Sequence, residues 1–162
     1  MIRRTIALVV TVVAPLCACA SRQGDVLRGY NFVLEPVYAV PHGEMFSITA
    51  AVLRAEGYTV KTRDSAETKG LLVTEPRFTA PSCFKPEARA EVEQLGLGLV
   101  VTAHTISKHD STEVGIWSDV VRRNPIAASQ RDRADELDGL LRVCGSTMVA
   151  SRLDSLAGRP TK

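Results

Sequence analysis

Few side chains of this chain could do chemistry, and their spacing matches no standard catalytic or ligand set. His104, His109 and Asp110 are residue types of a metal site, and Ser111 beside them adds the nucleophile type of a hydrolytic triad. His104 falls in an expected strand and His109 in the following loop, so their rings should point in different directions. The remaining histidine, His42, falls in an expected turn. We therefore expect no metal, no cofactor and no enzymatic activity.

Two cysteines in the body of the chain, Cys83 and Cys144, could form a disulfide. An even pair of cysteines in an exported chain favours this pairing. A bridge closing a loop of about 60 residues would stabilise the fold by about 4 kcal/mol in the chain-entropy model. The alternative is two buried free thiols, because cysteine often packs as a small apolar residue.

The N-terminal segment has the pattern of a secretory signal. Arg3 and Arg4 precede eleven uncharged residues, 6–16. That run is shorter than the roughly 20 apolar residues that a membrane-spanning helix needs. The alternative is a buried N-terminal helix of a cytosolic domain.

The end of this apolar run resembles a bacterial lipobox, Leu16-Cys17-Ala18-Cys19. The resemblance implies cleavage before Cys19, lipidation (including palmitate) of its thiol, and a membrane anchor made of several acyl chains. Ala20, rather than Asp, implies the outer membrane with the domain facing the periplasm. The alternative is cleavage after Ala18-Cys19-Ala20, which would give a soluble periplasmic or secreted protein.

Length and composition exclude several classes of protein. The 162 residues are 45% hydrophobic and 23% charged, unlike a disordered chain, and they contain only one long apolar run, unlike a polytopic membrane protein. Removal of Arg3 and Arg4 with the signal leaves 18 basic and 18 acidic residues. A net charge near zero gives no support to nucleic-acid binding.

The chain divides into four parts with one domain. We predict a signal peptide over residues 1–18, a lipidated cysteine and polar tether over 19–29, a single α+β domain over 30–158, and a tail over 159–162. Residues 44–56 and 131–157 have helical apolar spacing, and Gly57 follows the first of these as a helix C-cap. The expected strands are residues 30–40 (broken at Pro36), 58–63, 71–74, 88–94, 99–107 and 113–121.

Residues 88–94 fit two patterns. Their Ala and Glu content favours a helix, but Ala88, Ala90 and Val92 alternate with charged residues, which favours a half-buried strand. We predict a strand that forms a hairpin with residues 99–107. The fold class is then α+β: an antiparallel sheet of about five strands, with one short helix and one long C-terminal helix packed on it.

Details of the long helix can also be predicted. Ser129 and Asp132 have the spacing of a capping box. An apolar stripe along residues 137, 141, 144 and 148 should be buried. Gly139 and Gly145 would allow the helix to pack closely on the sheet. Trp117, in a strand, is expected in the core.

A longer pattern extends over residues 40–74: a turn, a helix ending in Gly57-Tyr58, a strand, a polar turn and Gly70 before a second strand. It resembles the repeating unit of helix-grip envelope lipoproteins such as the BamC component of outer-membrane protein assembly. The resemblance covers about a quarter of the chain and implies a helix packed on an antiparallel sheet. It assigns no functional residue.

From these patterns we expect a non-enzymatic accessory lipoprotein of the cell envelope. Its partners would be the membrane, through the lipid at Cys19, and an envelope protein. The alternative is a periplasmic module that holds a lipid or another apolar ligand between the sheet and the long helix.

Overall fold

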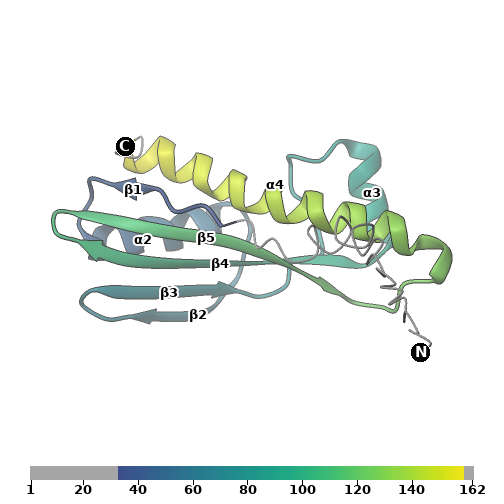
Figure 1. Ribbon diagram of the computed structural model, residues 1–162, viewed down its shortest axis with the longest axis horizontal. Helices are drawn as coiled ribbons and strands as arrows, with labels where there is room; N and C mark the ends of the chain where they lie inside the picture. Colours follow the sequence, from purple (N-terminus) through teal and green to yellow (C-terminus); the bar gives the residue numbers. More distant parts are fainter. Residues whose placement is uncertain (1–32, 159–162) are drawn as a thin grey trace, which may run out of the picture.

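The computed structural model describes residues 33–158, which form one antiparallel sheet and a layer of helices (Figure 1). The predicted signal peptide, Cys19, the tether over 19–29, the first residues of the predicted domain and the tail over 159–162 lie outside the described residues. The predicted α+β class, with a sheet of about five strands and a long C-terminal helix, is confirmed.

Within residues 33–158 the sheet has five strands in the order β1-β5-β4-β3-β2. The long strands β4 and β5 pair over their whole length and are joined by a two-residue turn, in which His109 has a φ of 56°. The strand bounds are Val37–Tyr38 for β1, Val60–Ser65 for β2, Lys69–Thr74 for β3, Leu97–Lys108 for β4 and Ser111–Arg122 for β5.

Strand β1 is shorter than predicted. Leu34 makes an isolated bridge to Ile116 in the same register as β1, and Pro36 separates this bridge from the two-residue strand. Pro36 cannot donate to the ladder, but its carbonyl accepts a hydrogen bond from the amide of Val114. The strand lies at the edge of the sheet, as a proline there requires.

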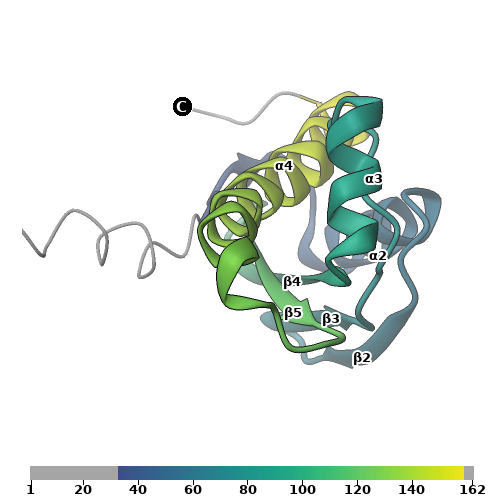
Figure 2. The same cartoon turned by 90° about the vertical axis from the view of Figure 1, so that its right-hand side faces the viewer.

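The helices of the described chain lie on one face of the sheet (Figure 2). They are α2 (His42–Ala55), α3 (Pro86–Gln94) and α4 (Arg131–Ala157), and a short 3₁₀ turn at Ala128–Gln130 leads into α4. Side chains from this face of the sheet and from the helices form a single core. The arrangement follows from strands that are apolar mainly on the side facing α2 and α4.

The strand predicted over residues 88–94 is wrong, because these residues belong to α3. Proline at the first helical position fits a helix start, and Ala and Glu favour the helix interior. Ala88 and Val92, four residues apart, face the interior, whereas Ala90 between them is exposed. The apparent alternation was therefore one face of a helix, and β4 forms its hairpin with β5 instead.

Helix α2 was predicted over 44–56; it begins two residues earlier and ends one residue earlier, at Ala55, with Gly57 terminating it as predicted. Gly57 has a φ of +82°, and the amides of Gly57 and Tyr58 bond to the carbonyls of Arg54 and Leu53, which is the Schellman arrangement. His42, expected in a turn, is the first residue of α2, because Pro41 before it can precede a helix without an N–H of its own. The His42 side chain is buried.

Helix α4 has its predicted bounds, but its predicted capping box is absent. The N-cap is Gln130, and no side chain caps it, because the 3₁₀ turn places Ser129 inside a turn of its own. Of the predicted stripe, Leu137 and Leu141 are buried, whereas Cys144 and Met148 are only half-buried. The buried stripe continues through Gly145, Ser146, Val149 and Leu153.

The prediction about the two glycines of α4 holds for one of them. A Cβ at Gly145 would overlap the side chain of Leu99 and lie 2.8 Å from Oγ of Ser118, so the helix packs on the sheet with no room for a side chain. A Cβ at Gly139 would meet nothing within 4 Å.

Three glycines of the sheet each lie under an aromatic ring. A Cβ at any of them would overlap that ring, so the absence of a side chain leaves room for the ring against the strand. The pairs are Gly70 with Phe46, Gly98 with Phe78, and Gly115 with His104.

Two buried tyrosines have opposite surroundings. The hydroxyl of Tyr38 donates a 2.7 Å hydrogen bond to Asp154 of α4, and burial together with that carboxylate raises the pKa of Tyr38 far above its ordinary value. The hydroxyl of Tyr58 is, among the described residues, the buried side-chain polar atom without a hydrogen-bond partner. Burial raises the pKa of Tyr58 to about 12, although the nearby Arg77 opposes the shift.

Candidate binding groove

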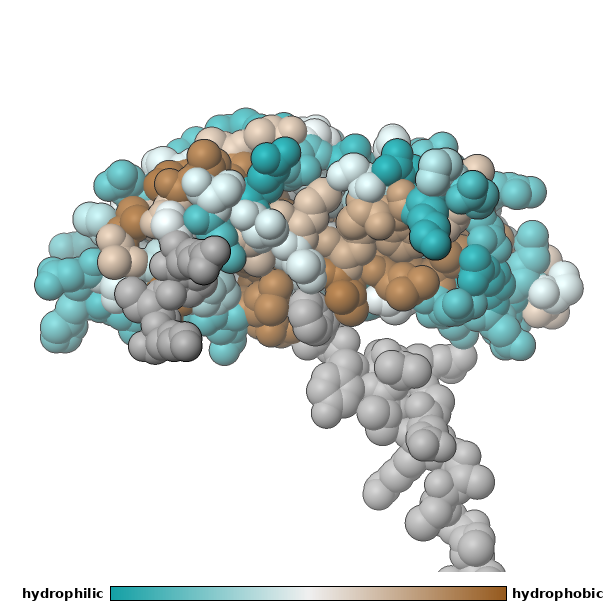
Figure 3. All heavy atoms as spheres, turned by 90° about the horizontal axis from the view of Figure 1, so that it is seen from above, coloured by the Kyte–Doolittle hydropathy of each residue, from teal (hydrophilic) through white to brown (hydrophobic). Residues whose placement is uncertain are grey.

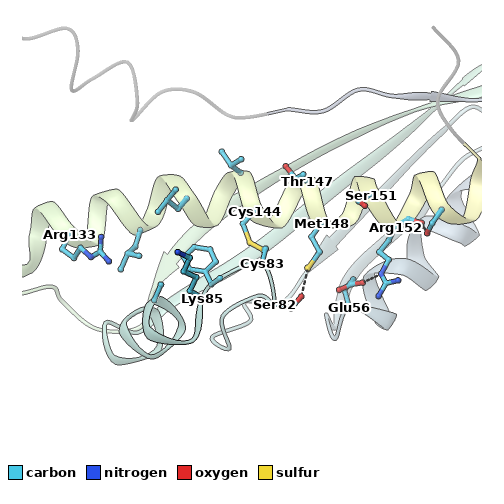
Figure 4. Close-up of a pocket in the computed structure, with 16 residues that line it drawn as sticks. Glu56, Ser82, Cys83, Lys85, Arg133, Cys144, Thr147, Met148, Ser151 and Arg152 are labelled. Carbon is cyan, nitrogen blue, oxygen red and sulfur yellow. Dashed lines mark hydrogen bonds and ion pairs between the residues drawn. A yellow bond between two sulfur atoms is a disulfide. The ribbon is translucent and has the colours of Figure 1, made fainter.

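An open groove runs along the outer side of α4, between this helix and residues 82–88 (Figure 4). We call it the α4 groove. Its volume is about 800 Å³, and it is lined mainly by apolar side chains. Those from α4 are Leu137, Leu140, Val143 and Met148, and those from the facing segment are Phe84 and Ala88.

The predicted disulfide between Cys83 and Cys144 is present and forms part of the groove. It joins residues 61 positions apart, with their Cα atoms 6.2 Å apart. Next to it, Oγ of Ser82 lies 3.8 Å from Sδ of Met148. The bridge therefore fixes the 82–88 segment at a set distance from α4, and this spacing defines the width of the groove.

Ion pairs close the two ends of the groove. At one end Arg133 of α4 donates to both carboxylate oxygens of Glu91 in α3, at 2.8 and 2.7 Å, and to Glu136 at 2.6 Å. These hydrogen bonds hold the pKa of the Glu91 carboxyl below its ordinary value. At the other end Nε of Arg152 lies 2.7 Å from Glu56, just after α2. The pairs tie α4 to both neighbouring helices.

The rim of the groove combines exposed apolar groups with cations. Leu140 is 51% exposed and Val143 is 45% exposed, three residues apart on α4. Figure 3 looks down on the α4 side of the molecule and shows hydrophobic side chains gathered in the middle of this face, with hydrophilic ones around both ends. Lys85 stands on the opposite rim, and it forms no ion pair with any residue of the described chain.

The space between α4 and the sheet, by contrast, is filled. Leu99, Val101 and Ile116 of the sheet are at most 1% exposed, and so are Leu137 and Leu141 of α4. These side chains all belong to the single buried core of the described residues. The α4 groove lies on the outer side of the helix instead.

The three histidines lie outside the α4 groove and in different parts of the fold. His104 lies on the face of the sheet that carries no helix, and His109 lies in the exposed β4–β5 turn beside Asp110. Nε2 of His42 lies 2.8 Å from Oγ1 of Thr105 in the core. No cluster of three or more metal-binding side chains occurs within residues 33–158.

Trp117 is not in the core, which corrects the prediction. It stands on the helix-free face of the sheet, half-buried, and its ring lies 5.3 Å from that of His104. The position follows from alternation in β5, because Ile116 and Ser118 on either side point toward α4.

Sequence reasoning missed Leu140 and Val143. The signal was present, since these residues are a pair of apolar side chains at helical spacing that do not belong to the buried stripe of α4. The groove itself depends on the neighbouring 82–88 segment, which was expected to lead into a strand.

Two findings complete the description. None of the helices within the described residues is both long and apolar enough to cross a membrane. The chain matches no protein-family model, and no curated protein proved significantly similar to it.

Proposed function

We propose that this chain is a non-enzymatic accessory lipoprotein of the cell envelope that docks a partner protein in the α4 groove. The observation that carries the proposal is an open apolar groove whose rim residues Leu140 and Val143 are about half exposed. Exposed apolar surface of this kind, next to polar residues, marks interaction sites.

The shape of the groove favours a protein partner over a small apolar ligand. Sites for small ligands bury most of the ligand surface in a cavity. The α4 groove is open along its length, and the interior under α4 is filled by side chains such as Leu99 and Leu141. A ligand held between sheet and helix, the alternative expected from the sequence, would have to displace that core.

Anchoring and location form the second part of the proposal. The lipobox resemblance makes Cys19 the lipidated residue and Ala20 directs the chain to the outer membrane. The disulfide of Cys83 and Cys144 supports an exported, oxidising compartment. The likeness of residues 40–74 to helix-grip envelope lipoproteins agrees with this location.

The test is photo-crosslinking in intact cells, with a crosslinking amino acid placed at Leu140, at Val143 or at Leu156. Leu156 is the matched control, because it is a leucine of the same helix, 65% exposed, that does not line the groove. We expect one protein of defined mass to be captured from positions 140 and 143 and not from 156. A Cys19→Ala variant should lose both the capture and the cofractionation with membranes.

Two outcomes would reject the proposal. Equal capture from all three positions would mean that the groove has no special role. If Cys19→Ala changes neither the membrane fractionation nor the capture, Cys19 is not the membrane anchor.

A further inference from the structure

We propose that the occupant of the α4 groove is an amphipathic α-helix of the partner protein, with an apolar stripe flanked by carboxylates. The inference rests on the proposed function and gives it a chemistry. Three features of the groove carry it: the state of its backbone groups, its length and apolar lining, and the placement of its cations.

The backbone along the groove presents no strand edge, because α4 forms one wall and α3 with the segment before it forms the other. One wall is α4, whose amides and carbonyls are bonded within the helix. In the other wall, the carbonyls of Ser82 and Phe84 already accept hydrogen bonds from Arg89, at 2.7 and 2.8 Å. An extended peptide needs a strand edge to pair with. A partner buried here must satisfy its own backbone groups, as a helix does.

The length and lining of the groove suit such a helix. The closing residues Arg133 and Arg152 are 19 positions apart on α4, or about 28 Å at 1.5 Å per residue. This is the length of about five helical turns. Leu140, Val143 and Met148 provide apolar contact in the middle of this length, and an opposing helix would meet them with anchors three and four residues apart. Beyond Met148 the α4 wall is polar, with Ser151 and Arg152.

The cations at the rim predict the charge of the partner. Lys85 has no acidic partner within the described chain, and Arg152 uses Nε for Glu56, so that its two terminal nitrogens remain available for a further acceptor. Arg133, in contrast, donates hydrogen bonds from Nε and both terminal nitrogens to Glu91 and Glu136. Carboxylates beside the apolar stripe would complement Lys85 and Arg152.

The test measures binding of two synthetic helical peptides to the full chain, produced with its own N-terminal segment in a bacterial envelope and held in lipid nanodiscs. Both peptides have about 19 residues and the same leucine stripe at three- and four-residue spacing. One carries Glu beside the stripe, and the other carries Lys. Fluorescence anisotropy of labelled peptide at low ionic strength gives the affinities, with empty nanodiscs as the blank.

We expect the Glu peptide to bind about tenfold more tightly than the Lys peptide, because attraction at the two cations replaces repulsion. Leu140→Asp should weaken binding by about tenfold or more, whereas Leu156→Asp should leave it within about twofold. Lys85→Glu should reduce the preference for the Glu peptide by about threefold. Far-ultraviolet circular dichroism and an intact disulfide verify that each variant is folded.

Four results would overturn the inference. Equal affinity for the two peptides would remove the charge argument, and equal effects of Leu140→Asp and Leu156→Asp would place the binding elsewhere. Binding of sodium palmitate that is lost in Leu140→Asp, with no binding of either peptide, would make an acyl chain the occupant. If photo-crosslinking from Leu140 captures a partner while both peptides fail, the proposed function stands and this inference falls.

Discussion

Replacing Gly139 and Gly145 of α4 by alanine should move the stability of the domain in opposite directions. The two residues lie in the same helix, six positions apart, and the substitution is the same. In an isolated helix both would gain about 1 kcal/mol from the better helix propensity of alanine. Only the surroundings of the added methyl group differ, so the pair isolates the effect of packing.

The structure sets the magnitude of each effect. At Gly139 the methyl group meets nothing within 4 Å, so the gain of about 1 kcal/mol should be fully expressed. At Gly145 the methyl group overlaps the side chain of Leu99, which is only 1% exposed and has no room to turn away. Such overpacking costs about 1–3 kcal/mol. The methyl group also lies 2.8 Å from Oγ of Ser118, which shares a 3.1 Å hydrogen bond with Ser146.

After the propensity gain is subtracted, Gly145→Ala should lower the free energy of unfolding by up to about 2 kcal/mol. Urea denaturation with the disulfide intact measures both values, and equal m-values verify that the unfolded states are comparable. In thermal unfolding, Gly139→Ala should raise the melting temperature by about 4 °C. If both variants prove more stable than the parent, α4 does not approach the sheet at Gly145 and the reasoning fails.

Three further predictions concern the disulfide and the buried phenols. Reduction of the Cys83–Cys144 bridge should lower the free energy of unfolding by about 4 kcal/mol, measured by urea denaturation with and without a dithiol; a loss below about 1 kcal/mol would contradict the loop-closure argument. Tyr38→Phe should lower the free energy of unfolding by about 2 kcal/mol, because it removes a hydrogen bond to the Asp154 carboxylate. Tyr58→Phe should leave the free energy of unfolding unchanged or raise it by about 1 kcal/mol, because the hydroxyl of Tyr58 is buried without a partner. Equal losses of stability in the two variants would refute this reasoning. The pKa of Tyr58 is about 12 in the folded state and about 10 in the unfolded state, so between these pH values the folded state binds more protons. The stability linked to protonation of Tyr58 is therefore fully present below pH 10 and is lost as the pH rises toward 12. Tyr58→Phe should make stability fall less steeply over this range than in the parent chain.

Local signals predicted much of the fold. Gly57 after an apolar helical stripe indicated the end of α2, and the structure has a Schellman motif there. The apolar spacing of residues 131–157 gave the bounds of α4 correctly. Cysteine number and export context indicated the pairing of Cys83 with Cys144. Each of these features depends on a few neighbouring residues or on a rule of compartment.

The errors arose where two local signals competed or where contacts are long-range. In α3, Ala88, Ala90 and Val92 fit a period of two, and only burial reveals that Ala90 faces water. Trp117 is apolar enough for the core, but which face of β5 the helices cover is decided by tertiary packing. The groove was not foreseen because it forms between Leu140 on one element and Lys85 on another, held together by the disulfide.

The contacts between aromatic rings and strand glycines limit which substitutions this sequence can accept. A ring fills the volume that a side chain at Gly98 or Gly115 would take, and at Gly70 the ring of Phe46 shares that volume with Oγ1 of Thr105, so a larger residue at any of these glycines requires a change in the neighbouring side chains. In diverging lineages, a larger residue at one of these glycines should appear together with a smaller residue at the ring that covers it. The pairs are 46 with 70, 78 with 98, and 104 with 115.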